Sequence, residues 1–210
     1  MTQSLLATNK PGRPLVAVGL IFIGLTICWD VVAITAGAPR YVILFSLPFV
    51  LVGLGIAVWG GLQMMAASRV GTPEVTFSNQ TPRVGERFSF NCRQTFSKQA
   101  NIERILIQLL MRESATYRRG TNTYTVTHDQ VIREFEHPGR GYNAGEMFFD
   151  EQTVQIPPDA MHTFEARRNK IIWLLTLKVE IAGWPDLTHE YPVTVLPERA
   201  QGEDNGWRNN

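Results

Sequence analysis

The order of apolar and polar side chains divides this sequence into two unlike parts. Residues 15–36 and 41–66 are apolar runs, and the charged side chains within or between them are Asp30 and Arg40. Each run is at least as long as the roughly 20 residues that an α-helix needs to cross the hydrocarbon core of a bilayer. Backbone groups in lipid must be hydrogen-bonded within their own segment, so both runs should be helical. The pattern predicts a transmembrane helical hairpin over residues 15–67.

Basic residues near the two runs predict the orientation of this hairpin. The link at residues 37–40 is too short for more than a tight turn, so both chain ends should lie on one side. Lys10 and Arg13 precede the first run and Arg69 follows the second, whereas the link contains Arg40 alone. Positive charge marks the cytoplasmic side. We therefore expect a multi-pass protein of the cell inner membrane, with its N- and C-termini in the cytoplasm.

After the second run the pattern changes to alternation, which is typical of strands with one buried face. In residues 87–94, for example, Phe88, Phe90 and Cys92 alternate with polar side chains. Further strands are predicted at residues 74–78, 102–112, 124–127, 146–149, 153–156, 170–181 and 190–196. Residues 102–112 also have helical spacing, but their β-branched side chains and the neighbouring strands favour a strand.

Many short strands separated by turns predict an all-β antiparallel sandwich over residues 73–197, of the immunoglobulin or arrestin-like kind. Polar segments flank the two parts: an N-terminal cytoplasmic tail at residues 1–14 and a C-terminal tail at residues 198–210. Both tails are rich in turn formers and should be mobile in isolation.

The second half of this domain carries packing and turn residues in a distinctive order. They are Phe148, Ile156-Pro157, Thr163-Phe164, the apolar strand around Trp173, Trp184-Pro185-Asp186-Leu187 and Glu190-Tyr191-Pro192-Val193. This order resembles the closing strands of arrestin-like sandwiches, including the sporulation-control type and domains of bacterial membrane proteins of unknown function. The resemblance covers residues 73–197. It implies an interaction module and no particular activity.

Charge and cysteine content narrow the class of protein further. The net charge of +1 gives no field that would attract nucleic acid, so no nucleic-acid partner is expected. Cys28 lies inside the first apolar run and Cys92 in the β domain, which makes a disulfide between them implausible. A lone thiol in a soluble domain fits a reducing compartment, in agreement with a cytoplasmic location.

The sequence contains no recognisable catalytic or metal-binding motif. The four histidines are scattered: His128, His137, His162 and His189. His128 and Asp129, with Glu134, Glu136 and His137, form a conceivable metal site, but adjacent strand residues point to opposite faces. We therefore predict no catalytic residue, no cofactor and no metal ion.

Asp30 is a carboxylate within an apolar run, and such groups are often functional. It also lies next to Trp29 and near the end of the first run, where it would reach headgroups or water. The second interpretation is favoured.

Small residues on the second run predict a helix-packing stripe. Gly53, Ala57 and Gly61 recur every four positions, a spacing that allows another helix to approach closely. The partner is either the first helix, which carries Gly19 and Gly24, or a helix of another subunit.

Two pairs of basic residues are candidates for contact with lipid headgroups: Arg118-Arg119 and Arg167-Arg168. Ordinary solvated loop charge is the simpler interpretation.

These features favour a non-catalytic accessory or scaffold subunit of a larger membrane complex, respiratory or photosynthetic. Its partners would be other membrane protein subunits and the lipid bilayer. The alternative is a free-standing, membrane-tethered adaptor that recruits a cytoplasmic protein. An enzyme that uses His128 or His162 is the least favoured class.

Overall fold

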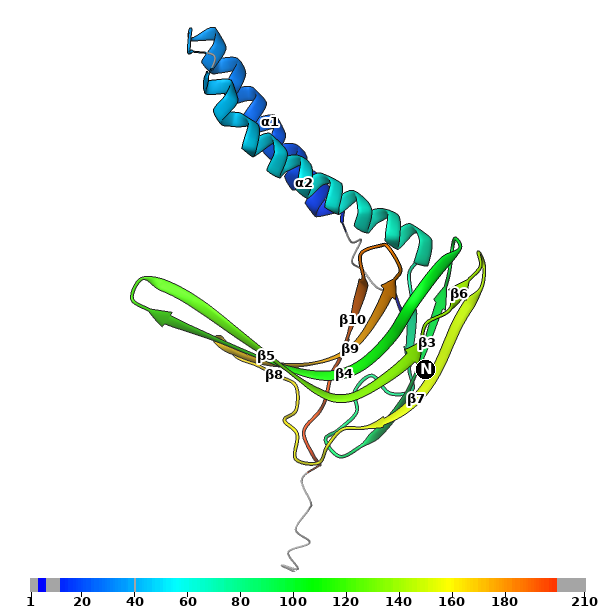
Figure 1. The fold of residues 1–210 in the computed structure, drawn as a ribbon. Coiled ribbons are helices and arrows are strands. Elements are labelled where there is room, and N and C mark those ends of the chain that lie inside the picture. Colours follow the sequence, from blue (N-terminus) through cyan, green and yellow to red (C-terminus); the bar gives the residue numbers. More distant parts are fainter. Residues whose placement is uncertain (1–3, 7–11, 40, 200–210) are drawn as a thin grey trace, which may run out of the picture.

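The computed structural model describes residues 4–6, 12–39 and 41–199. After a short strand at Ser4–Leu6, two apolar helices are followed by antiparallel β-sheets (Figure 1). The order of helices and then sheets confirms the prediction. Lys10, Arg40 and residues 200–210, on which part of the orientation and tail predictions depends, lie outside the described residues.

The helices α1 (Arg13–Thr35) and α2 (Tyr41–Val70) pack against each other as an antiparallel hairpin. α1 ends because Gly37 adopts a left-handed conformation with φ of 78°. The amides of Gly37 and Ala38 then donate to the carbonyls of Ile34 and Ala33, which satisfies the last carbonyls of the helix.

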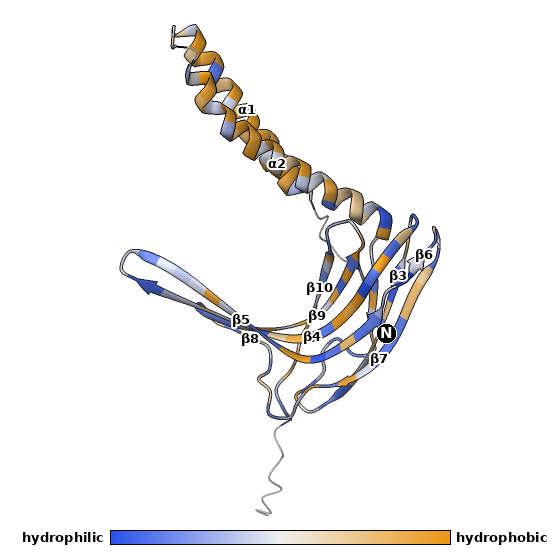
Figure 2. Ribbon diagram, in the orientation of Figure 1, coloured by the Kyte–Doolittle hydropathy of each residue, from blue (hydrophilic) through white to orange (hydrophobic). Residues whose placement is uncertain are grey.

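Both helices expose their apolar side chains instead of burying them in the β domain. In the most apolar window of each helix, 6% of α1 residues and 17% of α2 residues are buried. Figure 2 shows the same apolar character along most of the hairpin. By length and composition each helix is able to span a membrane, and neither resembles the core helix of a soluble domain.

One sheet has four strands in the order β1-β2-β3-β7. These are β1 (Ser4–Leu6), β2 (Glu74–Phe77), β3 (Arg87–Thr95) and β7 (Met147–Gln155). The strands predicted at residues 146–149 and 153–156 are one continuous strand. Ser4–Leu6, predicted to belong to a polar tail, instead extends this sheet by pairing with β2.

The other sheet has the order β10-β9-β4-β5. These strands are β10 (Leu187–Val193), β9 (Asn169–Ile181), β4 (Ala100–Arg119) and β5 (Asn122–Pro138), and the short β6 (Gly141–Tyr142) and β8 (Phe164–Glu165) pair with β4 and β9. The ambiguous segment 102–112 is a strand, inside β4. β4 and β5 are far longer than predicted, with 20 and 17 residues.

Alternate side chains of both sheets meet in one core. Phe77, Phe88 and Phe90 come from the four-stranded sheet, and Ile107 and Trp173 come from the other. All five are at most 2% exposed. Two sheets that share one apolar interior are consistent with the predicted β-sandwich.

The last turn of α2 is built into one end of this core. Ala66 and Val70 are completely buried and belong to the same apolar cluster as the sheets. The Gln94 amide donates to the Val70 carbonyl, and the Arg69 carbonyl accepts the amides of Ser97 and Lys98. The helix and the β domain are therefore joined through packed and hydrogen-bonded groups as well as through the short link that follows Val70.

Candidate functional site

The last third of β4 and the first third of β5 form a two-stranded ribbon, residues 114–127, which we call the arm. It projects beyond the rest of the sheet, toward the left in Figure 1. β9 pairs with β4 only as far as Ala115, so the strands beyond that point pair with each other alone. The ribbon is rich in β-branched threonines, which favour extended backbone. Gly120, with φ of 65°, supplies the turn at its tip.

The two faces of the arm differ in chemistry. Ala115 and Tyr117 follow Met111 at alternate positions, so they continue the core-facing side of β4. Tyr124 lies opposite Tyr117, and their rings stack with centroids 5.8 Å apart. The other face carries hydroxyls, with Thr116 and Thr125 bonded across the strands at 3.0 Å. The core-facing side of β4 thus continues past the point where the four-stranded sheet covers it.

A groove of about 550 Å³ lies where this uncovered side meets β8 and β9. It is lined by Glu113, Ser114, Ala115, Val126, His128, Met161, Phe164, Asn169, Lys170 and Ile171. Val126, Met161 and Phe164 are 54%, 53% and 44% exposed. The groove is therefore an accessible apolar surface with a few polar groups at its border, suited to holding a peptide segment or another apolar group.

The structure brings together the two basic pairs that were candidates for lipid contact. The amide of Thr116 donates to the carbonyl of Arg168 at 2.7 Å, which holds the loop before β9 against the arm. Arg118 and Arg119 follow within three residues along β4, and all four arginines are exposed. Two pairs about 50 residues apart in the sequence therefore lie at one end of the sheet.

Ion pairs cover the outer side of the six-stranded sheet. Arg112 contacts Asp129 at 2.7 Å and Glu190 at 3.1 Å, which connects β4 to β5 and to β10. Arg104 contacts Glu180 at 2.7 Å, and its hydrogen bond is the main reason why the pKa of Glu180 is lowered to about 2. Pairs this exposed add little stability individually, but they favour the observed register of the strands.

These contacts account for two of the three acidic residues of the conceivable metal site, and the third, Glu134, accepts a hydrogen bond from the Gln108 amide at 2.6 Å. Asp129 and Glu136 face Arg112 and Arg104, and the hydrogen bond from Arg112 lowers the pKa of Asp129. His137 instead contacts Asp150 of β7 at 3.1 Å, between the edge strands of the two sheets. Within the described ranges, no three side chains of the His, Cys, Asp or Glu type lie close enough to hold a metal ion.

The small residues of α2 lie against α1 of the same hairpin. A Cβ at Gly19 would be 2.6 Å from the carbonyl oxygen of Gly53 and 2.9 Å from the Cβ of Ala57. Gly60 makes the corresponding close approach to Gly12, whereas a Cβ at Gly61 would have nothing within 4 Å. At 3.6 residues per turn, position i+7 returns to within about 20° of the first residue, but i+8 is about 80° away. Gly61 is therefore not part of this contact, and Gly60 takes its place.

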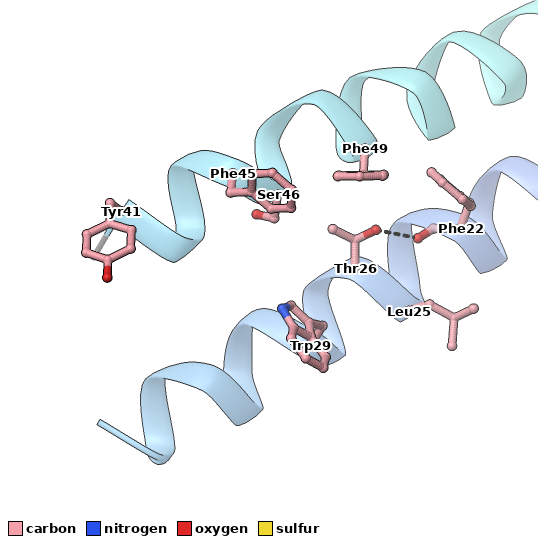
Figure 3. Close-up of a pocket in the computed structure, with 8 residues that line it drawn as sticks. All are labelled: Phe22, Leu25, Thr26, Trp29, Tyr41, Phe45, Ser46 and Phe49. Atoms are coloured by element: carbon pink, nitrogen blue, oxygen red, sulfur yellow. Dashed lines mark hydrogen bonds between the residues drawn. The ribbon is translucent and has the colours of Figure 1, made fainter. Parts of the chain in front are cut away.

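Asp30 faces the second helix. The hydroxyl of Ser46 donates to one of its carboxylate oxygens at 2.7 Å, and the other oxygen is buried without a partner among the described residues. An apolar groove of about 590 Å³ lies nearby, lined by Phe22, Leu25, Thr26, Trp29, Tyr41, Phe45, Ser46 and Phe49 (Figure 3). Asp30 thus has a polar partner inside the hairpin, which the sequence did not indicate.

Comparison with known proteins shows a likeness in fold to solved structures but no match in sequence. No protein family and no curated protein matches the sequence. Among solved structures, the crystal structure of Spo0M, a sporulation control protein from Bacillus subtilis, matches 59% of this chain with 14% identity and a TM-score of 0.47. This match confirms the resemblance to the sporulation-control type. The chain spans about half (48%) of the length of that protein, and a likeness this slight carries no argument about function.

Proposed function

We propose that this chain is a non-catalytic scaffold protein of a membrane, whose hairpin anchors it in the bilayer and whose β domain braces neighbouring subunits. The support comes from the joint between α2 and the sandwich. A brace must hold the β domain in a fixed orientation relative to the hairpin. Here no free hinge separates them, because Ala66 and Val70 are buried in the core and Gln94 forms hydrogen bonds at the joint. The guanidinium of Arg69 also lies 4.7 Å from the ring centre of Trp184, which adds a cation–π contact at the same joint.

In this proposal both ends of the hairpin near the β domain are cytoplasmic. Arg13 at the start of α1 and Arg69 at the end of α2 lie at the end of the hairpin that adjoins the sandwich. Positive charge at that end favours the cytoplasmic side. The membrane would be a bacterial inner membrane, and the partners would be other membrane protein subunits.

The hairpin would contact such partners with side chains other than the small residues that face α1. Gly53, Ala57 and Gly60 are occupied by α1, so they leave no close approach for a second chain. Exposed aromatic residues along the groove of α1 and α2, such as Trp29, Phe45 and Phe49, are the larger apolar surface that remains.

The first experiment is extraction of the full chain from native membranes in mild detergent, followed by native gel separation and mass spectrometry. A scaffold subunit should migrate with a fixed set of larger membrane proteins. A band of the chain alone, or of a small homo-oligomer, would refute the proposal.

A second experiment tests whether the rigid joint matters. Inserting a short Gly-Ser linker after Gly71 should release the complex while both the hairpin and the sandwich remain folded. The matched control is the same insertion after Asp159, in an exposed turn between β7 and β8 that takes no part in the joint. If both insertions leave the complex intact, the joint does not act as a brace.

One observation favours a second candidate, a free-standing adaptor that recruits a cytoplasmic protein. This observation is the accessible apolar groove beside the arm, where Val126, Met161 and Phe164 lie at the surface. The adaptor should be stable alone in the native gel, and replacing Val126 and Phe164 by Ser should abolish capture of its partner.

A further inference from the structure

The tip of the arm carries positive charge that the protein leaves unneutralised. Between Ser114 and Thr127 there is no acidic residue, whereas Arg118 and Arg119 stand at the turn. Other arginines of the β domain, such as Arg104 and Arg112, face carboxylates within 3.4 Å. Among the described residues, the four arginines 118, 119, 167 and 168 form no ion pair.

Aromatic side chains accompany these charges. Tyr117 and Tyr124 stack on each other at the base of the turn and remain 48% and 44% exposed. Tyrosine is enriched where a protein meets the headgroup layer, because its ring is apolar and its hydroxyl remains hydrated. Basic residues with exposed tyrosines fit an anionic lipid surface.

The position of the arm is consistent with such a surface. The arm and the helical hairpin extend from the sandwich toward the same side of the view in Figure 1. Because α2 is fixed to the sandwich by Val70 and Gln94, the arm cannot swing freely relative to the hairpin. An anchored hairpin would therefore hold the tip at a set distance from the bilayer.

We propose that the arm tip binds anionic lipid headgroups of the bilayer that holds the hairpin, through Arg118, Arg119, Arg167 and Arg168. This inference rests on the membrane anchoring in the proposed function. It adds a second point of contact, so that the sandwich is supported at the hairpin and at the arm. Each arginine removed should lower the ratio of bound to free tip roughly fivefold. High salt should also lower this ratio, because it screens the charges.

The test uses the full chain in lipid nanodiscs, with a fluorescent label at the tip. The label is attached at Thr121→Cys in a Cys28→Ser background. Cys92 is fully buried, and burial raises the pKa of its thiol to about 12, so it does not compete for the label. Quenching by neutral acrylamide is compared between discs of phosphatidylcholine and discs of an equal mixture with phosphatidylglycerol.

The label should be protected only in the anionic discs, and protection should be lost in Arg118→Glu/Arg119→Glu. The matched control is Arg87→Glu/Arg93→Glu, which reverses two exposed charges on the four-stranded sheet and should leave protection unchanged. Equal quenching in both discs would overturn the inference, as would protection found in native membranes alone, which would indicate an acidic protein partner. A chain that fails to enter the discs would instead refute the anchoring itself.

Discussion

The core residue Trp173 offers a quantitative test of the sandwich. Its side chain is fully buried in β9, between its neighbours Met111 on β4 and Val193 on β10. Its indole N–H donates to the carbonyl of Met161 at 2.9 Å. Trp173→Ala removes the largest fully buried side chain among the described residues and leaves that carbonyl without its donor. Truncations of this kind cost about 3–5 kcal/mol.

Cys92 provides the assay, because its thiol is completely covered in the folded domain and reacts only when the sandwich opens. In a Cys28→Ser background, the rate of alkylation reports the free energy of opening, provided that the domain recloses faster than the reagent reacts. Since each 1.4 kcal/mol is tenfold in population, Trp173→Ala should accelerate alkylation by roughly two to three and a half powers of ten.

Phe149→Ala is the matched control, since Phe149 is an aromatic residue that is 50% exposed on β7 and flanks the Cys92 pairing site. Surface substitutions of this kind change the free energy of unfolding by at most about 0.5 kcal/mol, so the rate of alkylation should change less than threefold. Trp173→Phe keeps an aromatic ring in the core, so its rate of alkylation should fall between those of Trp173→Ala and Phe149→Ala. If Trp173→Ala accelerates alkylation less than tenfold while circular dichroism still reports a folded domain, the packing argument is wrong.

Three further predictions concern the hairpin, the joint and one buried histidine. Gly19→Ala should strain the helix contact by about 1–3 kcal/mol and increase the interhelical distance measured between spin labels, whereas Gly24→Ala, with nothing within 4 Å, should not. Gln94→Leu removes the donor to the Val70 carbonyl and should cost about 1–3 kcal/mol; hydrogen exchange at the end of α2 should then rise, and unchanged exchange would contradict a rigid joint. Burial lowers the pKa of His189 in the folded domain, so the unfolded chain binds a proton at this side chain more readily. Stability to urea should therefore fall as the pH drops below 6.5, and His189→Leu should flatten that pH dependence.

Local patterns in the sequence were sufficient for the main elements. A continuous apolar run indicates a helix whose surroundings are apolar, and alternation indicates a strand with one buried face, because both patterns depend only on the helix and strand periods. Residues 102–112 satisfied both periods, and their β-branched side chains and the neighbouring strands identified them as a strand. The full length of β4 and β5 was missed, although the alternating threonines and tyrosines between Ser114 and Thr127 contain the signal.

The candidate sites depended on tertiary packing to a greater degree. Gly60 and not Gly61 meets α1, because the rotation of each helix about its axis is fixed by the partner that it packs against. Ser46 reaches Asp30 for the same reason, through a contact between residues 16 positions apart.

The amino-acid sequence by itself determined an apolar helical pair followed by antiparallel strands, since those elements follow from side-chain order along a single segment. Only the tertiary structure decided which surfaces remain free. The pairing of β4 with β9 stops at Ala115, so the arm projects uncovered and its groove stays open. The same register places Arg168 beside Thr116 and gathers two distant basic pairs at one end. Such neighbours are set by long-range strand pairing, which no local pattern in the chain encodes.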